Sequence, residues 1–238
     1  MTKLDGHEVV SHAAWLEARK ALLAEEKAFT QQRDALSRAR RALPWERVET
    51  DYAFEGPDGR QSLAALFAGR SQLIVYHFML GPGWGEGCKA CSFLADHFEP
   101  AVVHLAQRDV ILVAVSAAPL DEIEAFRQRM GWRFTWLSSH GSPFNRDFQV
   151  SFSPEELEAG AVTYNYVSQP FPSTEAPGLS VFVKGSDGAL FHSYSTYARG
   201  LDTLITAYNY LDLVPKGRDE EALDFSMSWV RLHDDYGS

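Results

Sequence analysis

The spacing of apolar side chains divides the sequence into a long helical segment and a longer segment of alternating strands and helices. Residues 11–43 lack Gly and Pro and are rich in Ala, Glu, Arg, Leu and Lys, which predicts one helix that ends before Pro44. Large apolar side chains recur every seven residues along it, at Trp15, Leu22, Phe29, Leu36 and Leu43. Such a stripe packs either along its own domain or against a partner subunit. A helix of roughly 50 Å would overhang a globule about 40 Å across, so we expect it to take part in a homodimer.

Beyond this helix, buried apolar runs alternate with segments of helical periodicity. The pattern predicts strands at 48–55, 72–80, 109–116, 134–138, 179–184 and 189–195, a strand or short helix at 62–67, and helices at 88–107, 120–130 and 202–211. Turns at 56–59 and 185–188 each contain two glycines, and Pro100 should kink the helix that contains it. The βαβ units require parallel strands with right-handed crossovers, and the closing hairpin adds antiparallel ones. We therefore predict an α/β fold, a mixed sheet with helices on both faces.

The distribution of charge restricts the partners of the protein. The formal net charge is −10, and residues 49–238 alone carry −12. This acidity disfavours nucleic acid and anionic membranes. No apolar run is long enough for a membrane span, and the first residues lack the apolar region of a signal peptide, so a cytoplasmic location is expected. We divide the chain into an arm at 1–47, a domain at 48–213 and an acidic tail at 214–238 that packs on the domain.

The candidate chemistry is a pair of cysteines, the only two in the chain. Cys88 and Cys91 follow a predicted strand and a glycine-rich loop and open a predicted helix. Free N–H groups and the helix dipole would stabilise a thiolate at Cys88, and the charge of Lys89 adds to this effect while that of Glu86 opposes it. Cys91 lies one turn later on the core side, where burial raises the pKa of a thiol. Cys88 is thus expected to attack a disulfide and Cys91 to resolve the product.

Two alternatives to a redox role remain open for these cysteines. The first is a zinc site, but zinc normally needs four ligands, and there is no second Cys-x-x-Cys motif. We therefore expect no metal and no other cofactor. The second alternative is a pair of structural cysteines without a redox role.

Several segments carry a resemblance to a known family over nearly the full length. They are WLEARKALLAEEKAFTQQRDAL (15–36), RRALPW (40–45), QLIVYHFM (72–79), VVHLAQRDV (102–110), RMGWRF (129–134), HSYSTYARG (192–200) and LDLVPKGRDE (211–220). With GCKACSF at the helix start, the chain resembles the DUF899 family of thioredoxin-like proteins, often labelled predicted dithiol–disulfide oxidoreductases. The resemblance implies a thioredoxin-like fold of the peroxiredoxin-like variant, with protein or small-molecule disulfides as partners.

The resemblance also suggests supporting residues around the dithiol. Thioredoxin-like enzymes place a cis-proline beside it, and Pro177 is the candidate, with an ordinary trans proline as the alternative. His77 lies where thioredoxins carry a buried acid, so it either accepts the proton of Cys91 or is a hydrogen-bonded core histidine. Trp84 either covers the dithiol or anchors the loop.

The chain departs from the related families in ways that keep other functions open. Thioredoxins carry Trp directly before the first cysteine, whereas Trp84 is four residues earlier. Peroxiredoxins use Pro-x-x-x-Thr/Ser-x-x-Cys, and no Thr or Ser lies between Pro82 and Cys88, which weakens a peroxidase. The alternatives to an oxidoreductase are a non-catalytic interaction module and a peroxiredoxin-like peroxidase. After the hairpin, His192, Tyr194 and Thr196 are expected on one strand face, where they line the cleft or make buried polar contacts.

Overall fold

The structure is a computed structural model that describes residues 2–4 and 6–237. The chain divides into two compact units, residues 1–44 and residues 45–238. The first unit holds a hairpin of β1 (Thr2–Leu4) and β2 (His7–Val9) and the helix α1 (His12–Arg41). The hydroxyl of Ser11 caps α1 by accepting a hydrogen bond from the backbone of Ala14 at 3.3 Å.

No residue of α1 is buried. The large apolar side chains of the seven-residue stripe are exposed, with Trp15 at 53% and Phe29 at 65% of their full exposure. The described residues of the first unit form no apolar core that covers this stripe. The homodimer expected from the sequence is therefore taken up below as a proposal.

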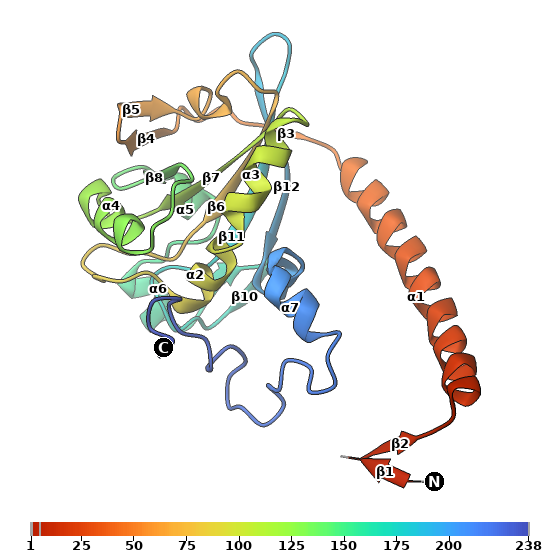
Figure 1. The fold of residues 1–238 in the computed structure, drawn as a ribbon. Helices are drawn as coiled ribbons and strands as arrows, with labels where there is room; N and C mark the ends of the chain where they lie inside the picture. Colours follow the sequence, from red (N-terminus) through yellow and green to blue (C-terminus); the bar gives the residue numbers. More distant parts are fainter. Residues whose placement is uncertain (1, 5, 238) are drawn as a thin grey trace. The chain divides into compact units, whose positions relative to one another are not determined.

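The second unit is built on an eight-stranded sheet with the order β3-β12-β11-β6-β7-β8-β4-β5 (Figure 1). The strands are β3 (Glu46–Arg47), β4 (Ala53–Gly56), β5 (Gly59–Ser62), β6 (Gln72–His77), β7 (Val110–Ser116), β8 (Trp136–Ser138), β11 (Gly178–Lys184) and β12 (Leu190–Tyr197). β6, β7 and β8 are parallel, and the other pairings are antiparallel. A separate hairpin pairs β9 (Val162–Tyr164) with β10 (Val167–Gln169).

The second unit also contains helical segments, some of which connect the parallel strands. They are η1 (Ala65–Phe67), α2 (Lys89–Ala95), α3 (Phe98–Ala106), α4 (Leu120–Arg129), α5 (Phe144–Asp147), α6 (Pro154–Glu158), η2 (Ala198–Leu204) and α7 (Thr206–Leu211). Right-handed crossovers are the rule for parallel strands and would place α2, α3 and α4 on one face, and the buried side chains of these helices do share one core. The opposite face is covered by η1 and α5, whose Phe67 and Phe144 are completely buried there. This arrangement is the thioredoxin-like, peroxiredoxin-like mixed sheet expected from the sequence.

The sheet separates two apolar cores, and alternation along β6 assigns its side chains to them. Leu73 and Val75 belong to the core under η1 and α5, whereas Tyr76 belongs to the core under α2, α3 and α4. Both cores are apolar, so β6 is buried on both faces, as the unbroken apolar run of its sequence predicts.

The helix expected at 88–107 is broken into α2 and α3. The break falls at Asp96 and His97, before Pro100. The ring of a proline clashes with the carbonyl group four residues earlier, which here is that of Asp96. The helix therefore ends at this point and restarts, and Pro100 lies in the first turn of α3.

The C-terminal segment packs onto the core that holds α2. Val230 and Leu232 are buried, Leu232 within that core, and Trp229 packs edge-on against Phe93 of α2 at 5.5 Å. Arg129 of α4 is ion-paired with Asp234 at 2.8 Å. None of the helices in the described part of the chain has the length and apolar character needed to cross a membrane.

Candidate functional site

The dithiol lies where the glycine-rich loop after β6 meets the start of α2. The loop is closed by a hydrogen bond from the backbone N–H of Cys88 to the carbonyl of Met79, at 3.0 Å. Cys88 is the N-cap residue of α2 and is partly exposed, whereas Cys91 is 1% exposed in the core below. The loop and helix therefore present one thiol to solvent and bury the other, as the sequence predicts.

The two thiols have opposite acidities. A hydrogen bond from the Cys91 thiol, with smaller contributions from the N–H groups of Cys91 and Ala90, lowers the pKa of Cys88 to about 7, although burial opposes this effect. Burial raises the pKa of Cys91 well above its usual range, and a charge on Cys88 raises it further. At neutral pH Cys88 is therefore the thiol that ionises, and Cys91 remains protonated.

Tyr76 is a site residue that the sequence analysis missed. Its hydroxyl is hydrogen-bonded to the thiol of Cys91 and lowers the pKa of Cys91, as does a hydrogen bond from the backbone of Met79. Burial raises the pKa of Tyr76 itself, so Tyr76 keeps its proton and can donate it in a hydrogen bond to a Cys91 thiolate. Since β6 is apolar on both faces, no alternation of polarity in the sequence identifies Tyr76 as the residue facing the dithiol.

His77, proposed from the sequence as the proton acceptor for Cys91, lies on the wrong face for that role. Adjacent residues of a strand point to opposite faces, and Tyr76 occupies the dithiol side. His77 is instead stacked on Phe144 at 5.4 Å, and its Nε2 is hydrogen-bonded to the hydroxyl of Ser180 at 2.9 Å. His77 is therefore a hydrogen-bonded core histidine, the alternative role considered for it.

The three supporting residues predicted in the glycine-rich loop and at the start of α2 are Trp84, Glu86 and Lys89, and each makes different contacts. The indole of Trp84 packs on Gly81, where an added Cβ would lie 2.7 Å from the indole nitrogen, so Trp84 anchors the loop to itself. Glu86 is ion-paired with Arg129, which also holds Asp234 of the C-terminal segment. Lys89 is the exposed first residue of α2. The loop is thus tied to α4 and, through Arg129, to the C-terminal segment.

Pro177 lies at the predicted place, and the structure decides between the two forms considered for its peptide bond. Gly178, the next residue, pairs with His77 at the end of β6, so Pro177 is close to the start of the dithiol loop. All peptide bonds in the described ranges are trans, so Pro177 is an ordinary trans proline, the alternative considered for it, and not a cis-proline. The carbonyl of Pro177 accepts a hydrogen bond from the hydroxyl of Tyr164 at 2.8 Å, which ties the β9–β10 hairpin to this region.

The residues after the closing turn also differ from the expected alternation. A β-bulge between the pairs Val181–Tyr194 and Phe182–His192 inserts Ser193 into β12. An extra residue reverses the faces beyond it, so His192 and Tyr194 point to opposite sides of the sheet. The expectation that His192, Tyr194 and Thr196 share one face is therefore wrong.

The described residues contain no group of three or more His, Cys, Asp or Glu side chains arranged to hold a metal ion. What the site offers is a pair of hydrogen-bonded thiols that differ in acidity and in exposure. Such a pair can attack and resolve a disulfide.

Comparison with known proteins gives one family and a set of similar folds. No curated protein matches the chain. Among solved structures, peroxidoxin BcpB from Mycobacterium tuberculosis is 15% identical with a TM-score of 0.44, and the match covers 69% of this chain and 94% of that one. A PrxQ mutant of Xylella fastidiosa is 11% identical with a TM-score of 0.43, over 70% of this chain and 94% of that one.

Peroxiredoxin Q of Xanthomonas campestris is similar at the same level, with 14% identity and a TM-score of 0.44 over 69% of this chain and 95% of that one. The fold assignment rests on the strand order and crossovers described above. The family described as "Bacterial protein of unknown function (DUF899)" matches residues 4–236. Because this match covers almost the whole chain, the protein belongs to the DUF899 family.

Proposed function

We propose that the protein is a thiol–disulfide oxidoreductase that uses Cys88 and Cys91 as its redox couple. The observation that carries the proposal is the difference between the hydrogen-bonded thiols: Cys88 is partly exposed with its pKa lowered to about 7, and Cys91 is buried with its pKa raised. An acidic, accessible thiol hydrogen-bonded to a buried thiol serves disulfide exchange, whereas a non-catalytic binding module does not depend on the acidity of its cysteines.

The reaction proceeds in two exchanges. The Cys88 thiolate attacks one sulfur of a substrate disulfide, forms a mixed disulfide and releases the other substrate sulfur as a thiolate. Cys91 then attacks the sulfur of Cys88, and its proton passes to the substrate sulfur that leaves, so the step forms the Cys88–Cys91 disulfide and releases the second substrate sulfur as a thiol. Tyr76 and the backbone of Met79 stabilise the Cys91 thiolate during this second step through their hydrogen bonds.

A redox titration tests the proposal. The protein is equilibrated in glutathione buffers of known potential, and the oxidised fraction is read by mass spectrometry after alkylation of free thiols. We expect one reversible two-electron couple between roughly −120 and −270 mV, the range of related redox proteins. A non-catalytic module would show no reversible couple, and that result would contradict the proposal.

The rate of alkylation of Cys88 should rise with pH around neutrality. Only the thiolate reacts, and the pKa of Cys88 is about 7, so the thiolate fraction grows as the pH passes from 6 to 8. Iodoacetamide labelling of reduced wild-type protein keeps the Cys91 thiol that acidifies Cys88. Mass spectrometry of samples quenched at increasing times separates label on Cys88 from label on Cys91, and a denatured sample provides the reference. A midpoint of 8.5 or above, the value of an ordinary thiol, would show that the surroundings do not acidify Cys88.

Replacing Tyr76 with phenylalanine should slow resolution while leaving the attack by Cys88 nearly unchanged. The substitution removes the hydroxyl that lowers the pKa of Cys91 and keeps the ring that packs on Phe98. A hydrogen bond to a charged group contributes about 1.5–3 kcal/mol, so resolution should slow by about tenfold or more. Rapid-quench analysis should show the mixed disulfide accumulating in Tyr76→Phe, with Tyr52→Phe as a control outside the site. Equal resolution rates in wild type and Tyr76→Phe would exclude this role.

The proposed partners are protein or small-molecule disulfides in the cytoplasm. A chain with only two cysteines, both in the proposed couple, suits a reducing compartment where dithiols are catalytic rather than structural. Nucleic acid is not among the proposed partners, because the charge of −12 over residues 49–238 repels phosphates.

A second copy of the chain is the partner proposed for α1. A seven-residue apolar repeat is the pattern by which two helices wind around each other. An antiparallel pair centred on Phe29 would place Glu17 opposite the partner's Arg41 and Glu25 opposite the partner's Arg33. A parallel pair would instead bring together the two basic last turns, each with three arginines, so the antiparallel arrangement is favoured.

Light scattering tests this dimer. The full chain should be dimeric, and Phe29→Glu should give monomers because two added carboxylates would meet at the centre of the pair. Gln31→Glu adds the same charge on the other side of the helix and should leave the dimer intact. A monomeric wild type, or a dimeric Phe29→Glu, would contradict the pairing.

A further inference from the structure

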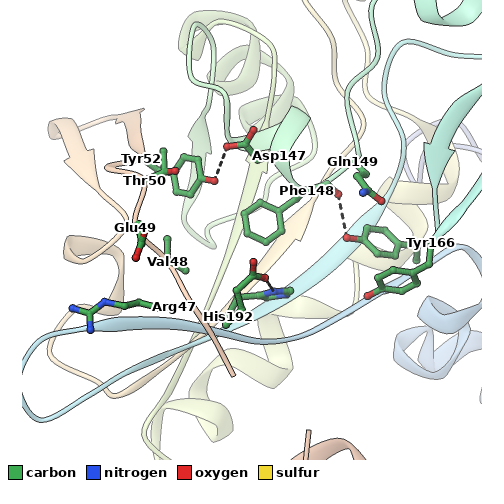
Figure 2. Close-up of a pocket in the computed structure, with 12 residues that line it drawn as sticks. Arg47, Val48, Glu49, Thr50, Tyr52, Asp147, Phe148, Gln149, Tyr166 and His192 are labelled. Atoms are coloured by element: carbon green, nitrogen blue, oxygen red, sulfur yellow. Dashed lines mark hydrogen bonds and ion pairs between the residues drawn. The ribbon is translucent and has the colours of Figure 1, made fainter. Parts of the chain in front are cut away.

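A pocket lies outside the dithiol site, against the core on the other face of the sheet. Its volume is about 410 Å³, within the size range of sites for small ligands. Figure 2 shows how the loop after β3 and the residues around α5 surround His192 of β12. Its aromatic walls are Tyr52, Phe148, Tyr166, His192 and Tyr197. The proposed disulfide chemistry uses none of these residues.

The walls of the pocket depend on costly local conformations. The bulge at Ser193 turns His192 toward this face. Gln149 and Tyr166 both have left-handed backbone angles, with φ of 57° and 65°, which are unfavourable for residues with a Cβ. Such strain is concentrated at functional sites, and here two strained residues line one pocket.

A chain of buried hydrogen bonds fixes the orientation of His192. Its Nε2 is 2.7 Å from the hydroxyl of Ser195, which is 2.8 Å from that of Ser180, which is 2.9 Å from Nε2 of His77. Nδ1 of His77 is buried without a hydrogen-bond partner among the described residues. Since buried N–H groups without partners are rarer than buried acceptors without partners, the proton of His77 lies on Nε2.

The direction of the whole chain follows from that proton. Ser180 accepts from His77 and donates to Ser195, which donates to Nε2 of His192. Nδ1 of His192 therefore carries a hydrogen and points it at the carboxylate of Glu46, 3.6 Å away. Burial lowers the pKa of His77 to about 3, so this end of the chain stays neutral at physiological pH.

The charges around the pocket favour a cation. Among the described residues that line it are three carboxylates, those of Glu46, Glu49 and Asp147, against the single arginine Arg47. Asp147 is held by a hydrogen bond of 2.7 Å from the hydroxyl of Tyr52. In Figure 2 the guanidinium of Arg47 extends away from His192, so it does not neutralise the interior. Faces of aromatic rings also attract cations.

We propose that this pocket binds a small organic ammonium ion, with the aromatic rings around its apolar part and Glu46 and Asp147 paired with its charge. A neutral molecule of the same shape would gain only the contact with the rings, and an anion would be repelled by the carboxylates. The site is independent of the dithiol, so its occupancy does not require either cysteine.

Binding of benzylammonium to the full-length protein tests the proposal, with benzyl alcohol as the neutral analogue and benzoate as the anion. NMR titration should show saturable shifts of the His192 ring protons with benzylammonium. Benzyl alcohol should bind about tenfold more weakly, because it loses the cation–π contact and the ion pairs with the exposed carboxylates of Glu46 and Asp147, and benzoate should not bind.

Matched variants locate the binding site. Glu46→Gln/Asp147→Asn should weaken benzylammonium binding about tenfold while keeping an acceptor for Tyr52. Asp58→Asn removes an exposed carboxylate from the β4–β5 turn and should have no effect, and Cys88→Ser should also bind normally. Equal binding of benzylammonium and benzyl alcohol, no saturation in the millimolar range, or an unaffected Glu46→Gln/Asp147→Asn variant would each overturn the proposal.

Discussion

Replacing Cys88 with serine should abolish disulfide reduction, whereas replacing Cys91 with serine should leave a protein that forms mixed disulfides and fails to release them. Cys88 is the exposed thiol with its pKa lowered to about 7, and Cys91 is buried with its pKa raised. The loss in Cys88→Ser should be on the order of 10³-fold or more, as expected when a covalent nucleophile is removed. Reduction of a chromogenic disulfide measures the turnover, and mass spectrometry measures the trapped adduct.

The same variants identify physiological partners. Cys91→Ser protein should capture substrates as adducts that a reductant releases, and the Cys88→Ser/Cys91→Ser double variant provides the background. Limited alkylation of reduced wild-type protein is a second readout, with label expected on Cys88 first. Label on Cys91 first, or an adduct on Cys91 in the Cys88→Ser variant, would reverse the assignment of the two thiols.

The fold was largely predictable because its signals are local and repeated. Apolar runs at 72–80 and 109–116 became β6 and β7, and the glycine-rich turn at 185–188 joins β11 to β12. The break between α2 and α3 was less accessible, since the pattern of apolar residues continues through it. Pro100 predicts a kink in this helix. The clash of its ring with the carbonyl of Asp96, four residues earlier, explains why the helix ends there and restarts.

The dithiol was predictable, but its surroundings were not. The Cys-x-x-Cys spacing and the helix start are local features, whereas the choice between Tyr76 and His77 depends on which face of β6 meets α2. A shift of one residue in strand register moves every side chain to the opposite face of the sheet. Because β6 is apolar on both faces, its sequence does not show which side chains face α2. The pocket around His192 could not be predicted for a similar reason, because no sequence pattern indicates the β-bulge at Ser193 that sets which face His192 occupies.

Replacing Gly87 with alanine should destabilise the protein and disturb Cys88 at the same time. An added Cβ at Gly87 would lie 2.6 Å from ring atoms of both Phe78 and Phe126. Both rings are buried, with exposures of 1% and 3%, so they cannot move into solvent. Overpacking of a core costs about 1–3 kcal/mol, which corresponds to about 2–4 °C in Tm per kcal/mol for a chain of this size.

Control variants show whether the loss of stability in Gly87→Ala comes from the contact with the two rings or from replacing any glycine with alanine. Gly237→Ala adds a Cβ that meets no atom within 4 Å and should leave Tm unchanged. Gly87→Ala should cost less stability when it is added to Phe126→Leu than when it is added to the wild type. The smaller side chain of leucine leaves room for the new Cβ, and residues in contact show such coupling. The alkylation rate of Cys88 should fall in Gly87→Ala, since the residue before Cys88 is displaced and with it the hydrogen bond from Cys88 to Met79 that closes the loop. A Gly87→Ala protein with wild-type Tm and wild-type Cys88 reactivity would show that the close packing of Gly87 does not position the dithiol.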